Sequence, residues 1–203
     1  MPKVRSNYVS LYYDHYKDTF EQLKGSLSKR DRLTLFLLLL AVLVALLSFD
    51  TERTGLIFTQ LLEKEYGIRE IGAAFIDTAS ILSLTYITLA YYRICLGIER
   101  LYVYIHNVEY TLSAYLGLNI DRESRNYLSS YPCLLTLIDW IYVYLLPVLL
   151  CGFAAYKFFA DWPGLTFDLR WLNELGLAVI ALSSLIYIRD RYCIRQATRR
   201  SRH

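Results

Sequence analysis

Four long apolar runs interrupt this chain, and its Lys and Arg residues lie outside these runs or at their edges. Seven Lys and Arg precede the first run, and the intervals after it carry three, four, two and six. The basic excess therefore alternates from one side of the runs to the other. A chain that crosses a membrane several times shows this alternation, because loops rich in Lys and Arg stay in the cytoplasm. The pattern predicts that the first, third and last intervals are cytoplasmic.

The apolar runs have the length of transmembrane helices. They cover residues 33–49, 71–92, 134–156 and 172–188, and about 20 residues cross a hydrocarbon layer of about 30 Å. Hydrophobic residues make up 55% of the chain, which is high for a soluble protein. No run alternates like a barrel strand, so only helices can satisfy the backbone in lipid. We predict an all-α, polytopic membrane protein with four transmembrane helices and both termini cytoplasmic.

This topology divides the chain into five parts. They are a cytoplasmic amphipathic N-terminal segment (1–32), a first transmembrane hairpin (33–92), a cytoplasmic helical hairpin (93–133), a second transmembrane hairpin (134–188) and a basic cytoplasmic tail (189–203). The tail has six Arg and one acid. Such a flank typically contacts anionic lipid headgroups, and we expect no nucleic-acid partner.

The N-terminal segment shows an apolar stripe at helical spacing. Its members are Tyr8, Tyr12, Tyr16, Phe20 and Leu23. The stripe predicts an amphipathic helix, and Gly25 is expected to end that helix before the first span. The first span lacks the small, polar character of the second span and is expected to face lipid.

A heptad pattern follows the second span. Spacings of four and three residues alternate along Ile94, Ile98, Leu101, Ile105, Val108, Leu112 and Tyr115, as in a coiled-coil seam. We therefore predict that the second span continues into the cytoplasm as one rod of about 45 residues, about 35 Å of it beyond the bilayer. The partner of the seam is either the N-terminal helix of the same chain or another subunit. In the second case the oligomer seam comprises Ile98, Leu101, Ile105, Val108 and Leu112.

The face of the rod opposite the seam carries titratable groups. A candidate cytoplasmic interaction face comprises Glu99, Tyr102, His106 and Glu109. One interpretation is that this face responds to pH or binds a ligand. The alternative is that it is an ordinary solvated helix face. Arg100 and His106 also match the Arg-x4-6-His spacing of HEPN-type ribonucleases. Because residues six apart on a helix point about 120° from one another, a ribonuclease is the least favoured hypothesis.

Three acids lie inside the predicted spans, namely Asp77, Asp139 and Glu174. Intramembrane carboxylates cost a few kcal/mol on insertion scales, at about 3 kcal/mol for a central Asp, and are functional candidates by default. Asp77 is the deepest, and Lys157 near the outer end of the third span is expected to neutralise one acid. Ser80, Ser83 and Thr85 follow Asp77 and complete the set of pore-lining or polar intramembrane candidates. Small and hydroxylated residues also serve ordinary helix packing.

The chain shows no common nucleotide-binding, metal-binding or acyl-transfer motif. Its four Cys have no C-x-x-C spacing, so we expect neither a metal nor a disulfide framework. We therefore predict no cofactor and no enzymatic activity. Pro147 and Gly152 in the third span predict a kink.

The segments IERLYVYIHNVE, YLSSYP and IDWIYVYLLP resemble the layout of small four-span bacterial membrane proteins of phage-defence and CRISPR-associated loci. The resemblance covers most of residues 90–150 and transfers no site residue. It implies a bacterial inner-membrane effector or accessory protein that perturbs the bilayer or regulates a neighbouring nuclease. We predict a self-associating, channel-like protein that alters membrane permeability when its cytoplasmic helix is engaged by a protein partner. The alternative is a membrane-anchored scaffold or regulator of a cytoplasmic partner.

Overall fold

The computed structural model describes residues 2–49, 56–57, 59–61, 63–64, 73–117, 133–160 and 167–200, and these residues are helical apart from the turn at Gly117. The elements are α1 (Pro2–Phe49), α3 (Ala73–Leu116), α5 (Cys133–Trp140), the π-helical turn η1 (Ile141–Leu145), α6 (Leu146–Ala160) and α7 (Phe167–Arg200). Within this described part, four stretches are long and apolar enough to cross a membrane, namely Ser10–Ser48, Ala74–Leu116, Ile141–Phe159 and Leu169–Ile194. The predicted all-α class is confirmed for this described part, and the four stretches indicate a multi-pass membrane protein.

One helix, α1, contains both the N-terminal amphipathic segment and the first span. The prediction that Gly25 ends the first helix is therefore wrong. A helical Gly costs only about 1 kcal/mol relative to Ala, whereas Leu23 and Leu27 on either side of Gly25 pack against α3. Tertiary packing of an apolar face decides helix stability more than propensity does.

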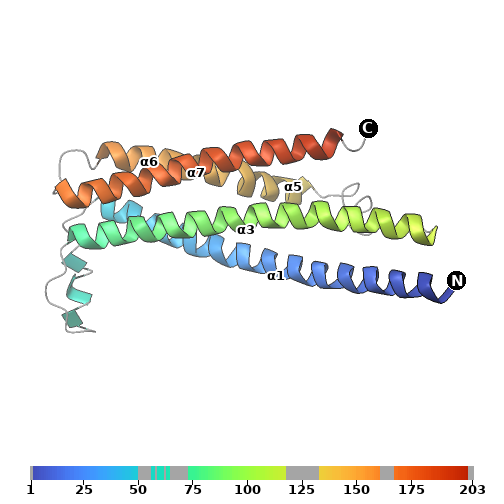
Figure 1. Cartoon of the computed structure of the whole chain (residues 1–203). Coiled ribbons are helices and arrows are strands. Elements are labelled where there is room, and N and C mark those ends of the chain that lie inside the picture. The colour runs from blue at the N-terminus through green and yellow to red at the C-terminus, as the bar shows by residue number, and fades with distance from the viewer. Residues whose placement is uncertain are drawn as a thin grey trace.

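The predicted rod is confirmed as α3, which runs unbroken for 44 residues. Its C-terminal half lies beside the N-terminal half of α1, and the two helices extend beyond the ends of α5 and α7 (Figure 1). We call this pair, residues 10–30 of α1 and 93–116 of α3, the stalk. The N-terminal end of α1 and the C-terminal end of α7 lie at the same end of the molecule (Figure 1).

The heptad seam forms the core of the stalk. Ile98, Ile105, Val108 and Leu112 are buried against Tyr16 and Leu23 of α1, with Ile94 and Leu101 at the edge. At the far end of the stalk the ring of Tyr115 lies beside Tyr12. Of the two alternative partners, the structure uses the helix of the same chain. In this arrangement the five residues of the predicted oligomer seam are not available to another subunit.

The remaining core joins α1, α3, α6 and α7 over the apolar part of the chain. Leu37 and Val44 of α1 are buried in it together with Ile81 and Leu84 of α3 and Ile180 of α7. The other face of the first span stays exposed, as expected of a helix that faces lipid, and comprises Leu35, Phe36, Leu38, Leu39, Val42 and Leu46. The second span is more deeply buried than the first. This makes α3 the central helix of the bundle.

The third predicted span contains the π turn η1 immediately before Pro147. Proline has no N–H and its ring clashes with the carbonyl four residues earlier, here that of Val143. The N–H of Leu146 bonds to the carbonyl of Ile141, five residues earlier, which widens the helix by one residue. The distortion expected at Pro147 thus takes the form of a π turn between α5 and α6.

Candidate functional site

A buried ion pair joins α3 to α6 inside the apolar part of the bundle. Lys157 Nζ lies 3.1 Å from Asp77 Oδ2, and the two side chains are 1% and 4% exposed. Asn173 of α7, which is also buried, donates from Nδ2 to the same carboxylate oxygen at 3.4 Å. The expectation that Lys157 neutralises an intramembrane acid is met by Asp77. We call these three residues the charged cluster.

The helix order explains how the charged cluster forms. Asp77 lies one turn after the first residue of α3, Lys157 lies one turn before the end of α6, and Asn173 lies two turns after the start of α7. All three positions belong to the end of the bundle that lies opposite the stalk (Figure 1). A long Lys side chain is needed there, because its apolar stem can cross the core while its ammonium reaches the carboxylate.

The other two predicted acids do not join this cluster. Glu174 accepts from Arg170 Nε at 2.7 Å one turn earlier in α7, and both side chains are partly exposed. Asp139 belongs to α5, but its side chain lies outside the described residues. Of the three intramembrane acids, only Asp77 is shown in a buried contact with other helices.

The hydroxyl residues after Asp77 point in different directions. Ser80 is buried, while Ser83 is exposed and donates to the carbonyl of Ala79 on its own helix. Thr85 bonds to the carbonyl of Ile81 and, at 3.3 Å, to that of Gly176 in α7. A Cβ added to Gly176 would lie 3.1 Å from Ile81 Cγ2 and from Thr85 Oγ1. Thr85 therefore marks a close approach of α3 and α7.

Further polar contacts follow along the interface of α3 with α7. The hydroxyls of Tyr92 and Ser184 are 2.8 Å apart and either can donate, and the Tyr92 ring stacks on that of Tyr187. Nearer the stalk, Glu99 forms an ion pair with Arg191, and Arg191 is buried. These contacts tie the base of the stalk to α7.

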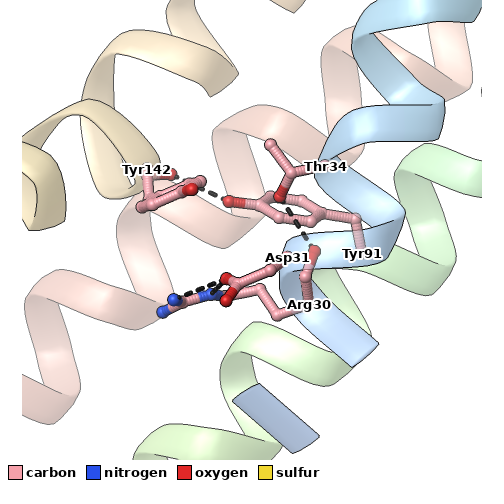
Figure 2. Close-up of polar contacts among 5 residues, drawn as sticks. All are labelled: Arg30, Asp31, Thr34, Tyr91 and Tyr142. Carbon is pink, nitrogen blue, oxygen red and sulfur yellow. Dashed lines mark hydrogen bonds and ion pairs between the residues drawn. The ribbon is translucent and has the colours of Figure 1, made fainter. Parts of the chain in front are cut away.

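The base of the stalk is also tied to η1 (Figure 2). The Arg30 guanidinium of α1 lies over the Tyr142 ring at 4.7 Å and donates to Asp31. The Tyr91 hydroxyl of α3 donates to the Tyr142 backbone carbonyl at 3.3 Å, and Thr34 donates to the Arg30 carbonyl. Tyr142 in the π turn is thus held by both helices of the stalk.

The predicted cytoplasmic interaction face is partly closed within the chain. Glu109 is buried and accepts from the Tyr16 hydroxyl at 3.0 Å, and Glu99 is paired with Arg191. The ring of His106 lies near that of Tyr102, and its Nε2 is buried without a hydrogen bond partner in the described part. Arg100, the other residue of the ribonuclease-like spacing, is exposed.

Sequence reasoning missed Asn173, Ser184 and Arg191, which complete three of these contacts. They all lie on α7, far from their partners in sequence, and Glu174 was the residue of that helix that the sequence analysis singled out. An amide inside the fourth span and an Arg just after it were the available signals. Among the described residues, no three His, Cys, Asp or Glu side chains lie close enough together to hold a metal ion.

No protein-family model, no curated protein and no solved structure matches this chain.

Proposed function

We propose that this chain is a non-enzymatic membrane effector in which α3 couples the stalk to the charged cluster. Engagement of the stalk by a protein partner moves α3 against α6 and α7, loosens the contact of Asp77 with Lys157 and raises membrane permeability. The observation that carries the proposal is that one unbroken helix contains both the stalk seam and Asp77. A displacement at one end of such a helix reaches its other end without an intervening loop.

The energetics of the charged cluster support a functional role. Two charges taken out of water lose several kcal/mol of solvation each, roughly, and their attraction returns this only in good geometry. Apolar residues of similar volume would hold α3 to α6 at least as well. Ionisable groups inside membrane helices are accordingly rare and accompany ion or proton pathways. Asp77 and Lys157 are therefore better explained by a task than by stability.

The membrane setting belongs to the same proposal. The N-terminal end of α1 and the C-terminal end of α7 lie at one end of the bundle (Figure 1), which fits two termini on one side of a membrane. The basic excess of the first, third and last intervals assigns that side to the cytoplasm. We place the chain in a bacterial inner membrane and in defence, as the sequence resemblance implies. Because α1 occupies the seam, self-association would use the lipid-facing surface.

The first experiment measures membrane potential in cells that express the chain at controlled levels. The wild type depolarises the membrane, and Asp77→Asn, which removes the charge and keeps the shape, does not. Leu82→Ser is the matched control, because Leu82 is exposed on the same helix and the change adds a polar group away from the cluster. Equal depolarisation by wild type and Asp77→Asn at equal membrane abundance contradicts the proposal.

A membrane-anchored scaffold is the second candidate, and the outer surface of the stalk favours it. Val103 and Tyr110 on α3 and Leu11 and Tyr13 on α1 are exposed apolar side chains in a segment that extends past the other helices. A scaffold binds a cytoplasmic protein through these residues and conducts nothing. It predicts a co-purifying protein that is lost in Val103→Asp with Tyr110→Asp, together with an unchanged membrane potential.

A further inference from the structure

One face of α3 is turned toward α7 along most of the bundle. Its residues recur every three or four positions and are Asp77, Ile81, Leu84, Thr88, Tyr92, Cys95 and Glu99. All but Glu99 are buried, and Glu99 is partly buried. The face is polar at both ends and apolar between them, which divides it into three sections.

The section nearest the stalk consists of groups that can pass on a proton. Glu99 is paired with Arg191, the Tyr92 and Ser184 hydroxyls are 2.8 Å apart while Ser184 also donates to the Ile180 carbonyl, and Thr88 Oγ1 is buried without a partner in the described part. A hydroxyl both donates and accepts, so Tyr92, Ser184 and Thr88 carry groups that can take a proton on one side and release one on the other. The section from Glu99 to Thr88 spans about 16 Å along the helix.

The section at the opposite end is the charged cluster. Asp77 Oδ1 and Asn173 Oδ1 are buried, and neither has a hydrogen bond partner among the described residues. Buried acceptors of this kind are normally satisfied by ordered water. Lys157 Nζ beside them is a proton donor, at 3.1 Å from the other Asp77 oxygen. Arg170 and Glu174, which pair with each other on α7, are the nearest further charges on that helix.

The middle section is an apolar plug. Ile81 and Leu84 are both 0% exposed and separate Asp77 from Thr88. Thr85 beside them bonds to Gly176 O, so the two helix backbones are close at this level. The side chains of Ile81 and Leu84 offer no hydrogen-bonding group, and the Thr85 hydroxyl beside them donates to the carbonyls of Ile81 and Gly176.

Resting on the function proposed above, we propose that the permeant species is the proton and that it passes along the interface of α3 with α7, with Ile81 and Leu84 as the barrier. A proton moves from the Lys157 ammonium to the Asp77 carboxylate, which leaves a neutral amine and a neutral carboxyl group. The Asp77 carboxyl group then releases its proton to water between the helices, in the direction of Thr88. The Lys157 amine takes up a new proton from the side of the N-terminal end of α3. A metal ion would have to lose its hydration water and separate the ion pair. A proton instead passes from one hydrogen-bonded group to the next.

The test opens the barrier by mutation. Ile81→Ser and, as a second variant, Leu84→Ser are reconstituted into liposomes that contain a pH-sensitive dye, and a potassium diffusion potential drives the flux. Each variant gives proton uptake at least about tenfold faster than wild type, equivalent to about 1.4 kcal/mol of barrier. Leu82→Ser, which is exposed on the same helix, leaves the rate unchanged. Adding Asp77→Asn or Tyr92→Phe to Ile81→Ser reduces the uptake, and helical content and elution volume confirm that each variant is folded.

The outcomes separate this inference from the proposed function. Proton uptake without sodium or potassium flux supports the inference. Sodium or potassium flux that depends on Asp77 overturns the proton assignment and leaves the proposed function standing. Folded Ile81→Ser and Leu84→Ser variants that are as tight as wild type overturn the inference, and so does a leak that survives Asp77→Asn.

Discussion

Lys157 Nζ of α6 lies 3.1 Å from Asp77 Oδ2 of α3, in a part of the bundle where both side chains are almost completely buried. Asp77 lies on the same helix as the stalk seam, which packs on α1. Helix α3 therefore carries Asp77 of the charged cluster near one end and the stalk seam near the other.

Removal of one partner of the ion pair should cost more than removal of both. Asp77→Leu leaves a buried ammonium and Lys157→Met leaves a buried carboxylate, so each should lower the free energy of unfolding by about 3–5 kcal/mol. The double variant should recover most of this loss. Denaturant unfolding in bicelles measures the cycle, with Arg170→Met as the control because its pair with Glu174 is partly exposed and worth about 1 kcal/mol or less. Additive losses in the double variant would contradict a coupled pair.

The contact of α3 with α7 at Gly176 should tolerate no larger side chain. A Cβ added there would lie 3.1 Å from Ile81 Cγ2 and Thr85 Oγ1. Gly176→Leu should therefore separate the helices and lower the free energy of unfolding by about 1–3 kcal/mol. Gly25→Ala is the matched control, because no atom lies within 4 Å of a Cβ at Gly25. That control should stabilise the protein by about 0.5–1 kcal/mol. Thermal unfolding of both variants gives the comparison, and a Gly176→Leu variant as stable as wild type would refute the close packing.

The stalk should open when its seam is made polar. Ile105 is completely buried against α1, so Ile105→Asp places an unpaired charge in the seam. Amide hydrogen exchange should then accelerate over residues 10–30 and 93–116, while the apolar spans remain protected. Val103→Asp is the control, because Val103 is exposed two residues before Ile105, on the other side of α3. Unchanged exchange in Ile105→Asp would show that the two helices are not paired.

The base of the stalk should depend on Arg30 as a cation. Its guanidinium lies 4.7 Å from the centre of the Tyr142 ring, an arrangement worth about 0.5–2 kcal/mol. Arg30→Gln should lower stability by this amount and loosen η1, and Tyr142→Leu should give a similar loss that does not add to it. The exposed Arg32 supplies the control Arg32→Gln. A purely additive double variant would indicate that the two side chains act independently.

The sequence predicted the features that local pattern determines. The uninterrupted apolar spacing from Ile94 to Leu112 predicted the rod, and the positions of Asp77 and Lys157 toward the outer ends of their spans predicted that Lys157 neutralises one intramembrane acid. Gly25 misled the prediction of α1, because the modest cost of a helical glycine is outweighed by Leu23 and Leu27 packing on α3. Arg191 and Asn173 were missed because their partners Glu99 and Asp77 become neighbours only when α7 folds onto α3. Contacts of this kind depend on tertiary geometry that spacing along the chain does not contain.

The most direct test of the coupling combines the two ends of α3 in one measurement. Proteoliposomes containing Ile105→Asp, which opens the stalk, are compared with proteoliposomes containing Ile105→Asp together with Asp77→Asn, and the decay of an imposed membrane potential is recorded. The account predicts that Ile105→Asp speeds the decay relative to wild type and that Asp77→Asn abolishes the increase. A decay that is the same in wild type and Ile105→Asp, or one that Asp77→Asn does not change, would contradict the coupling of the stalk to the charged cluster.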